Sequence, residues 1–528
     1  MARKLLLLLL VCTSFLVHDV TGKRRKDKDR EKQSLSENTE NVCEIPDPNR
    51  SIDCFCDKAG YQNASDATCW LFYELQPDSV VWGYFTSQTN IEKLKINIRP
   101  DGILKYVPTW VLSQLRNLKV FDVLYGDIAE ISPYAFANLS SLQEISMTRN
   151  KIIELKPYSF AKLPKLTQVT LDDNRITEIR REVFIGLPVL KSLYIDRNNL
   201  RLIYDRAFLH LYRLEELELN GNQLSVITRD TFMGLQSLKV LSLQDNRIKM
   251  LGEYTFNETP FLAELSMDRN GLQYINENAF HGLSQLHRLS LSENQLKSLP
   301  NNVFNDTPNI RFLDLRDNSL SMLSSETVRP IMESLKDVST YFFVEGNNLV
   351  CNCQLSWVYP LRNETASDQI RNSLDELTCK PQVDAKKKLL DDIEEKLLED
   401  IEGKLPDDPK KNLQSDIRRL TQDITDSLLG STMKPLRIVD DDDVFIEQGY
   451  DSYGRPVQPN FVTTESNSVK HLFDIPMQDL PCPENVHRDH ETSVTPDLKS
   501  KSGQGRNKNA CIYHYIVSAM FVLILTVM

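Results

Sequence analysis

Apolar positions return every 24 residues through the middle of this chain. In residues 214–224, LEELELNGNQL, leucines stand at the first, fourth, sixth and eleventh positions and an asparagine stands at the ninth. The pattern begins at Ile91, takes one turn of 27 residues, and keeps strict register from Leu118 onward. Successive side chains of a strand point to opposite faces, so each repeat predicts one short strand with its leucines facing inward. A single repeat cannot bury that face alone, so the sequence predicts stacked repeats and a parallel sheet.

Asparagines and phenylalanines repeat with the same period. Each asparagine follows a predicted strand, where its amide can satisfy backbone groups that the turn leaves unpaired, and we expect its loss to cost about 1 to 3 kcal/mol. The phenylalanines should pack from the opposite, convex side. Gly126 takes the asparagine position in the repeat that starts at Leu118. The two series are Asn150, Asn174, Asn198, Asn222, Asn246, Asn270, Asn294 and Asn318, and Phe136, Phe160, Phe184, Phe208, Phe232, Phe256, Phe280 and Phe304.

Length, charge and cysteines limit the class of protein. A chain of 528 residues is too long for one compact core but suits one elongated repeat domain with appendages. The net charge of -12 argues against a nucleic-acid partner, which needs a basic face, and leaves basic protein partners open. Ten cysteines, with none between Cys69 and Cys351, indicate disulfides confined to two caps. For the first group, zinc is the alternative, but the secretory start and the one-residue gap between Cys54 and Cys56 favour disulfides.

Both ends of the chain predict targeting segments. Residues 1–22 have Arg3 and Lys4 before a leucine run and small residues at the end, which is typical of a signal peptide. The apolar run of residues 516–528 is short of the roughly 20 residues that a spanning helix needs. A polar spacer precedes it, so we expect a tail that directs attachment of a glycosylphosphatidylinositol (GPI) lipid anchor, with a short single-pass transmembrane span as the alternative. The attachment candidates are Ser502, Gly503 and Asn509.

The repeats resemble the extracellular, cysteine-capped, 24-residue class of leucine-rich repeats. The F-x-x-L segment of that class stands at residues 160–163 and 184–187, and the resemblance covers about residues 43–379. It implies an α/β solenoid, a horseshoe with short parallel strands on its concave face and disulfide caps at both ends. The four-cysteine caps of this class pair first to third and second to fourth. This implies the pairs Cys43 with Cys56, Cys54 with Cys69, Cys351 with Cys379, and Cys353 with Cys482.

The C-terminal cap departs from the family pattern by about a hundred residues between Cys379 and Cys482. Leucines and isoleucines at helical spacing before and after Pro406 predict a helical hairpin, which could pack on itself, dock on the repeats or pair with another chain. The resulting plan is 1–22 signal peptide, 23–42 basic disordered arm, 43–90 N-terminal cap, 91–350 about ten repeats, 351–383 C-terminal cap, 384–430 helical insert, 431–481 acidic disordered segment, 482–509 cap closure and stalk, and 510–528 anchor tail.

Six sequons predict N-glycans on a secreted chain, and unused matches are the alternative. Thr259 and Thr307 replace family leucines and complete two of them, which should place glycans in one row on the convex flank. The six asparagines are Asn49, Asn63, Asn138, Asn257, Asn305 and Asn363.

The sequence predicts a binding surface and no enzyme. We find no nucleophile motif, phosphate loop, metal-ligand spacing or cofactor motif in it. The variable positions between the repeat leucines hold thirteen acids and five bases and should face the concave side, although they could merely keep a bare sheet soluble. The candidate contact residues are Tyr125, Asp172, Asp173, Tyr194, Glu216, Glu218, Glu264, Asp268, Phe312 and Asp314.

The whole layout resembles insect lipid-anchored adhesion proteins built on these repeats. This implies a cell-surface protein that binds cell-surface proteins, including copies of itself, in neurons and muscles, and binds the membrane through its anchor but no nucleic acid. A co-receptor for a protein ligand and a matrix-organising protein are the alternatives. Because like charges repel, an acidic face needs an offset contact, a cation, the convex edge or the basic arm 23–28 to meet its own copy.

Overall fold

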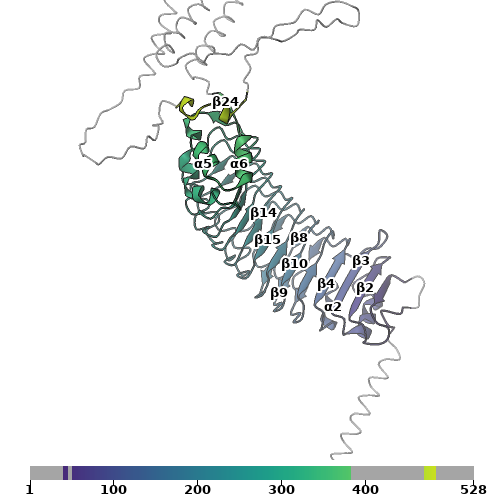
Figure 1. Cartoon of the computed structure of the whole chain (residues 1–528). Helices are drawn as coiled ribbons and strands as arrows, with labels where there is room; N and C mark the ends of the chain where they lie inside the picture. Colours follow the sequence, from purple (N-terminus) through teal and green to yellow (C-terminus); the bar gives the residue numbers. More distant parts are fainter. Residues whose placement is uncertain (1–39, 46–49, 382–468, 483–528) are drawn as a thin grey trace, which may run out of the picture. The chain divides into compact units, whose positions relative to one another are not determined.

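A parallel β-solenoid forms the body of the computed structural model, which describes residues 40–45, 50–381 and 469–482. Its strands lie side by side in one thirteen-stranded sheet (Figure 1), and all pair in parallel except β1 with β2. In sheet order the strands are β1 (Ile52–Cys56), β2 (Asp66–Leu71), β3 (Lys93–Ile98), β4 (Val120–Leu124), β7 (Glu144–Ser146), β10 (Gln168–Thr170), β13 (Ser192–Tyr194), β15 (Glu216–Glu218), β16 (Val240–Ser242), β18 (Glu264–Ser266), β20 (Arg288–Ser290), β21 (Phe312–Asp314) and β22 (Tyr341–Phe343).

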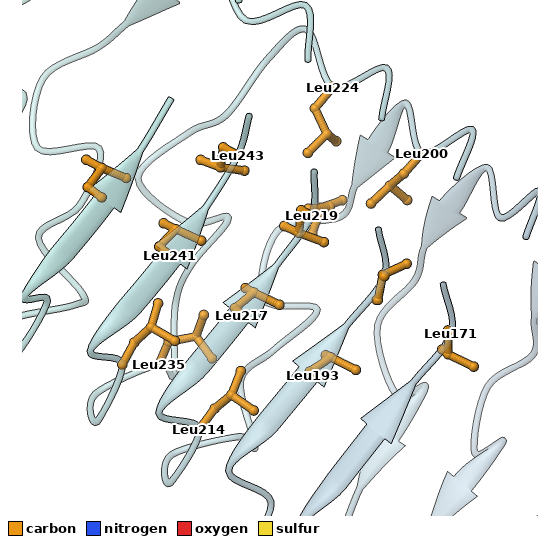
Figure 2. Packing of buried hydrophobic residues seen from close by; sticks show 14 of the residues in the cluster. Leu171, Leu193, Leu200, Leu214, Leu217, Leu219, Leu224, Leu235, Leu241 and Leu243 are labelled. Atoms are coloured by element: carbon orange, nitrogen blue, oxygen red, sulfur yellow. The ribbon is translucent and has the colours of Figure 1, made fainter. Parts of the chain in front are cut away.

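The 24-residue period sets the register of this sheet. Leu193 pairs with Leu217, and Leu217 pairs with Leu241, so equivalent repeat positions stand next to each other. These leucines are fully buried, and Figure 2 shows them stacked beneath neighbouring strands. Burying a leucine side chain contributes about 1.5 to 3 kcal/mol, and each repeat gains it only from its neighbours. The structure therefore confirms the predicted solenoid.

The opposite side of each repeat is made of turns and two-residue strands. The repeat phenylalanines are buried there, and Phe160 stacks on Phe136 and Phe184 with ring centroids 5.3 and 5.2 Å apart. Such stacking adds to the burial of the rings. The short strands form one group of three and three pairs. The group is β6 (Phe136–Ala137), β9 (Phe160–Ala161) and β12 (Phe184–Ile185), and the pairs are β5 (Glu130–Ile131) with β8 (Glu154–Leu155), β11 (Glu178–Ile179) with β14 (Leu202–Ile203), and β17 (Met250–Leu251) with β19 (Tyr274–Ile275).

The asparagine ladder satisfies the backbone as the sequence predicts. The Asn174 amide donates to the carbonyls of Met147 and Leu171 at 2.7 and 2.9 Å, and its Oδ1 accepts the N–H of Ile152 at 3.1 Å. At Gly126 the backbone N–H donates to Asn150 Oδ1, and an added Cβ would lie 2.6 Å from that oxygen. A glycine therefore fits this position because the next asparagine reaches over it.

The N-terminal cap closes the sheet with an antiparallel hairpin. Disulfides join Cys43 to Cys56 and Cys54 to Cys69, and the second links paired positions of β1 and β2. These are the pairs that the family resemblance implied. The helices of this half are the 3₁₀-helix η1 (Val80–Gln88) and α2 (Thr109–Gln114).

The C-terminal cap covers the last repeat with helices. Disulfides join Cys351 to Cys379 and Cys353 to Cys482, again the pairs that the resemblance implied. Tyr359 holds the returning segment by donating its hydroxyl to the carbonyl of Leu472 at 3.0 Å. The elements are α3 (Ser325–Val328), η2 (Arg329–Ile331), α4 (Met332–Leu335), β23 (Val350–Cys351), η3 (Cys353–Leu355), α5 (Val358–Glu364), α6 (Asp368–Asp375), β24 (Thr378–Pro381), β25 (Lys470–His471), η4 (Leu472–Asp474) and η5 (Met477–Asp479).

Several predictions fall on residues outside the described ones. These are the signal peptide, the basic arm up to residue 39, Asn49, the helical insert, the acidic segment up to residue 468, and the anchor tail with Ser502, Gly503 and Asn509. The prediction of disorder is wrong for residues 469–481, which form β25, η4 and η5 and bury Leu472 and Leu480 against the cap. Within the described residues, no helix has the length and apolar composition needed to cross a membrane.

Candidate functional site

The candidate site is the sheet face, which we define as the outward side chains of the large sheet. Because the strands pair in 24-residue register, equivalent positions form four rows. In the repeat of β15, row 1 is Glu216, row 2 is Glu218, row 3 is Asn220 and row 4 is Gly221. Side chains in one row lie about 4.8 Å from the next strand's, close enough for direct pairing along the stack.

Row 4 is a ladder of ion pairs along one edge of the sheet face. Asp173 accepts from Arg149 at 3.3 Å and from Arg197 at 2.7 Å, so one carboxylate links three repeats. Arg269 joins Asp245 at 2.7 Å and Glu293 at 3.5 Å in the same way. The hydrogen bond from Arg197 holds the pKa of Asp173 below its usual value, and Arg269 does the same for Asp245.

The ladder breaks at Gly221. Its φ of +63° lies in the left-handed region, as do the φ values of the other row 4 residues. Because glycine has no side chain, Arg197 has no row 4 partner on β15. An added Cβ would lie 3.2 Å from the Arg197 side chain. The charges of row 4 thus form two separate groups, one before Gly221 with an excess positive charge and one after it with an excess negative charge.

Row 3 carboxylates bind the backbone of the following repeat. Asp172 accepts the N–H of Asp196 at 2.8 Å, and Asp196 accepts the N–H of Asn220 at 2.7 Å. Asn220 continues the series by accepting the N–H of Gln244 at 2.9 Å. These side chains therefore stabilise the stack, a role that the sequence analysis did not assign to them. Their common 24-residue spacing was the signal.

Two predicted contact residues are buried, which corrects the prediction for them. Asp268 is 7% exposed and accepts hydrogen bonds from Ser290 and from the N–H and hydroxyl of Ser292. Asp314 is 3% exposed and pairs with Arg316 at 2.6 Å. Both carboxylates turn back onto their own chain because unpaired buried charges are costly. They are not available to a partner.

The middle of the sheet face holds an uncompensated acidic cluster, Tyr194, Glu216 and Glu218. The Tyr194 hydroxyl donates to Glu216, and partial burial raises the pKa of Tyr194 to about 12. Burial, with the nearby charge of Asp196, raises the pKa of Glu218 to about 7. Among the described residues, neither glutamate forms an ion pair. A cation from a partner would relieve this repulsion.

An arginine-aromatic cluster occupies the C-terminal strands of the same face. The Arg288 guanidinium lies over the ring of Phe312, 3.7 Å from its centroid. Phe343 lies 5.7 Å from Phe312, and Tyr341 lies 6.1 Å from it. Arg288 makes no ion pair within the described part of the chain. Tyr341 and Phe343 were not among the contact residues predicted from the sequence, although they hold the row 1 and row 2 positions of the last repeat.

The remaining predicted contact residues lie on the sheet face but apart from both clusters. Tyr125 is 54% exposed and accepts a hydrogen bond from Arg149 at 3.0 Å. Glu264 lies on β18, between the two clusters, and its carboxylate is 3.9 Å from Nε2 of His287. Both remain candidates for a wide contact rather than for a single anchor point.

An open groove of about 730 Å³ runs beside the acidic cluster, at the N-terminal ends of the strands. Glu215 lies in it between Lys191 at 3.2 Å and Lys239 at 2.7 Å. Phe261 is 60% exposed on its wall. This groove was not predicted from the sequence, although its lining residues form two series that repeat every 24 positions, from Thr167 to His287 and from Val189 to Gln285.

The described residues hold no grouped metal ligands, and their glycosylation sequons lie outside the four rows. Within residues 40–45, 50–381 and 469–482, no three His, Cys, Asp or Glu side chains are grouped to hold a metal ion. The described sequon asparagines all lie outside the four rows: Asn63, Asn138, Asn305 and Asn363 are exposed, and Asn257 is half-buried. Thr259 and Thr307 are buried and donate their hydroxyls to the carbonyls of Phe256 and Phe304 at 2.8 and 3.2 Å.

Family models match the repeats. The model described as "Leucine rich repeat" matches residues 116–176 and 164–224, and the "BspA type Leucine rich repeat region (6 copies)" matches residues 201–327. The matched segments are the strict 24-residue repeats of the solenoid.

One relative and two solved structures are similar to parts of the chain. Connectin of Drosophila melanogaster is 32% identical over 87 residues, which are 16% of this chain and 13% of connectin. A structure of the Drosophila Toll–Spatzle complex has 21% identity and a TM-score of 0.47, covering 58% of this chain and 44% of that one. The TLR13-ssRNA13 complex has 21% identity and a TM-score of 0.38, covering 58% and 53%.

Proposed function

Because this chain is a cysteine-capped leucine-rich-repeat protein of the extracellular kind, resembling connectin, we propose that it is a cell-surface adhesion protein. Its sheet face recognises a protein on the opposing cell, and a copy of the chain itself is the favoured partner. The signal peptide, N-glycans and GPI anchor expected from the sequence belong to this proposal. They would hold the solenoid at the outer surface of the plasma membrane.

The acidic cluster carries the proposal. Most charges along the edge of the sheet face are paired, whereas Glu216 and Glu218 in its middle form no ion pair with any residue that the structure describes. The unpaired carboxylates of Glu216 and Glu218 gain no stabilisation from an ion pair in the folded chain. Burial raises the pKa of Glu218, because it disfavours the charged form of this side chain. A partner's cation at this point would gain the attraction that the chain itself leaves unused. Tyr194 supplies the aromatic contact area that concentrates binding energy at interfaces.

The second candidate is a GPI-anchored co-receptor, which binds a soluble or surface protein and signals through another chain. The observation that favours it is the groove beside the acidic cluster, where exposed Phe261 gives an apolar anchor for a ligand. The two candidates differ in what the sheet face binds. A co-receptor needs no contact between copies.

Mixing of cells tests the proposal. Cells that express the full chain are dyed and mixed with undyed cells that do not, in a line that does not aggregate by itself. We expect aggregates of expressing cells alone. Mixed aggregates would argue for a different partner on all cells, and the absence of aggregates would favour the co-receptor. Release of the chain by a phosphatidylinositol-specific phospholipase tests the anchor separately.

A further inference from the structure

A row of exposed apolar side chains runs along the flank of the solenoid, beyond the C-terminal ends of the sheet strands. We define the flank row as Leu202, Val226, Met250 and Tyr274, each four residues after a ladder asparagine. These side chains are 44 to 66% exposed, whereas the residue that follows each of them is buried in the core. Met250 pairs with Tyr274 across β17 and β19, so neighbouring members of the row lie one strand spacing apart.

The fold does not require apolar residues at this position. Glutamates hold it in the three preceding repeats, as Glu130, Glu154 and Glu178. Each of these glutamates forms an ion pair with Lys156 or Arg180. Four consecutive apolar residues at an exposed position therefore indicate a surface that another molecule covers. None of the described sequon asparagines lies within four residues of the flank row, so glycans at these sites leave it open.

The two borders of the flank row differ in charge. In residues 175–297, the positions one and three residues before the row, on the side of the sheet, hold cations and no acid: Arg175, Arg201, Arg247, Lys249 and Lys297. The position three residues after each member of the row is mostly acidic and holds Asp205, Arg229, Glu253 and Glu277. Among the described residues, neither Arg247 nor Glu253 forms an ion pair. Both are therefore open to a partner's charge.

A second copy of the chain matches these borders. Turning it about an axis along the flank row lays each member against its own counterpart and exchanges the two borders. Arg247 then faces Glu253 of the second copy, and the same contact forms a second time by symmetry. The remaining positions three residues before the row meet no like charge, since Asn199, Gln223 and Gly271 face Asp205, Arg229 and Glu277.

The arrangement with reversed stacks matches the charges less well. It keeps each border against itself, so Arg229 faces Glu253 but Asp205 faces Glu277, and like charges across a contact are costly. In either orientation the central repeats of two flanks can touch, because the flank lies beside the hollow of the sheet face and not across it. Charge therefore favours parallel stacks.

We propose that two copies of this chain on one cell pair side by side through their flank rows, with their stacks parallel. Parallel stacks place both C-terminal caps at the same end, as two chains held in one membrane require. This rests on the proposed membrane anchor and not on homophilic adhesion. Anchoring raises the local concentration of the chains, so a narrow contact suffices. Both sheet faces stay open in the pair, so recognition of an opposing cell is measured separately.

Cysteine cross-linking of the full-length chain on cells tests the pairing. Val226→Cys places a cysteine opposite its own counterpart, where the oxidising cell exterior allows a disulfide between the copies. Cells are kept sparse so that they do not touch, and the surface-labelled chain is run on a non-reducing gel. We expect at least about fivefold more covalent dimer than from Val338→Cys, because Val338 is also exposed but lies at the N-terminal end of β22, on the other side of the sheet.

Charge variants test the borders in the same assay. With Val226→Cys present, Glu253→Arg sets a like charge against Arg247 and should lower the dimer at least about threefold, and adding Arg247→Glu should restore it. These variants should aggregate cells as the wild type does, because the sheet face is unchanged.

Two results would overturn the pairing while adhesion stands. One is dimer from Val226→Cys no higher than from Val338→Cys, and the other is dimer that Glu253→Arg does not lower. Cross-linking only in a mixture of Val226→Cys chains with Met250→Cys chains would overturn the parallel stacks, because reversed stacks set these two residues against each other. If wild-type cells do not aggregate but Val226→Cys cross-links, homophilic adhesion fails and the pairing stands.

Discussion

The Oδ1 atom of Asn222 accepts the backbone N–H of Leu200, which lies 22 residues earlier in the chain, at 2.9 Å. The amide of the same side chain donates to the carbonyl of Ile195 at 2.9 Å, so one asparagine joins two consecutive repeats. Replacing Asn222 with leucine leaves these groups buried without partners. We expect the free energy of unfolding to fall by about 1 to 3 kcal/mol. Urea unfolding measures this change in free energy. The control is Asn199→Ala, at a turn position outside the asparagine ladder, which should lower the free energy of unfolding by under about 0.5 kcal/mol.

Glu218 should make stability depend on pH. Its pKa is about 7 in the folded chain and near 4.5 in an unfolded one, so the folded state holds the proton more tightly. The stability from this group is present below about pH 4.5 and is lost as pH rises through 7. Glu218→Gln removes that loss and should raise the Tm at pH 8 by about 2 °C or less, because solvent screens a half-exposed group.

The same comparison of Tm values at pH 4.5 tests whether the charge of Glu218 causes the gain at pH 8. At this pH Glu218 is neutral in the folded chain and about half ionised in the unfolded one, so Glu218→Gln should change the Tm much less than at pH 8. Glu277→Gln, on an exposed turn, should give no difference at either pH. An equal gain for Glu218→Gln at pH 4.5 and pH 8 would show that charge is not the cause.

The bridge between Cys353 and Cys482 should stabilise one end of the solenoid only. It closes a loop of sequence separation 129, and bridges of this kind typically contribute about 2 to 4 kcal/mol. Replacing both cysteines with serine should expose residues 469–482 and the cap strands β23 and β24 to hydrogen exchange. Because repeats contact only their neighbours, β2 to β4 should keep their protection. Loss of protection throughout the sheet would contradict this local role.

Thr259 should serve two roles that one substitution separates. It is buried and donates its hydroxyl to the Phe256 carbonyl, and it completes the sequon of Asn257. Thr259→Leu restores the leucine of the other repeats and removes the sequon, whereas Thr259→Ser keeps it. We expect Thr259→Leu to run faster on a gel by one glycan and to remain folded. Identical migration of the two variants would show that Asn257 carries no glycan.

The repeats were predictable because one 24-residue period sets both the residue type at each position and the place of that position in the stack. Asn222 and Phe256 recur at fixed spacing, and any stack that buries the leucines must place them as the structure does. The sheet-face rows follow from the same period, so the stacking of Arg288 on Phe312 was within reach of the sequence, since the two residues are 24 positions apart.

Burial of individual carboxylates was not predictable in the same way. The alternation of a strand places Asp268 and Asp314 outward, but it does not say whether the side chain extends to solvent or turns to a neighbouring donor. Ser290 and Ser292 supply those donors to Asp268 from the next repeat, and Arg316 supplies them to Asp314 from its own. The residues that line the groove near Phe261 follow the 24-residue period and were therefore within reach of the sequence, whereas the shape of the groove depends on loop conformation.

A glycan placed on the sheet face tests most directly whether this face is the recognition surface. Ser242→Asn with Gln244→Thr creates a sequon on β16, in the centre of the face, and Arg229→Asn creates one with Thr231 on a turn outside it. Both chains are expressed on cells, and a mobility shift after endoglycosidase treatment verifies that each glycan is present. The account predicts that the glycan on β16 abolishes aggregation and that the one on the turn leaves it unchanged. Aggregation that persists with an occupied glycan on β16 would contradict it.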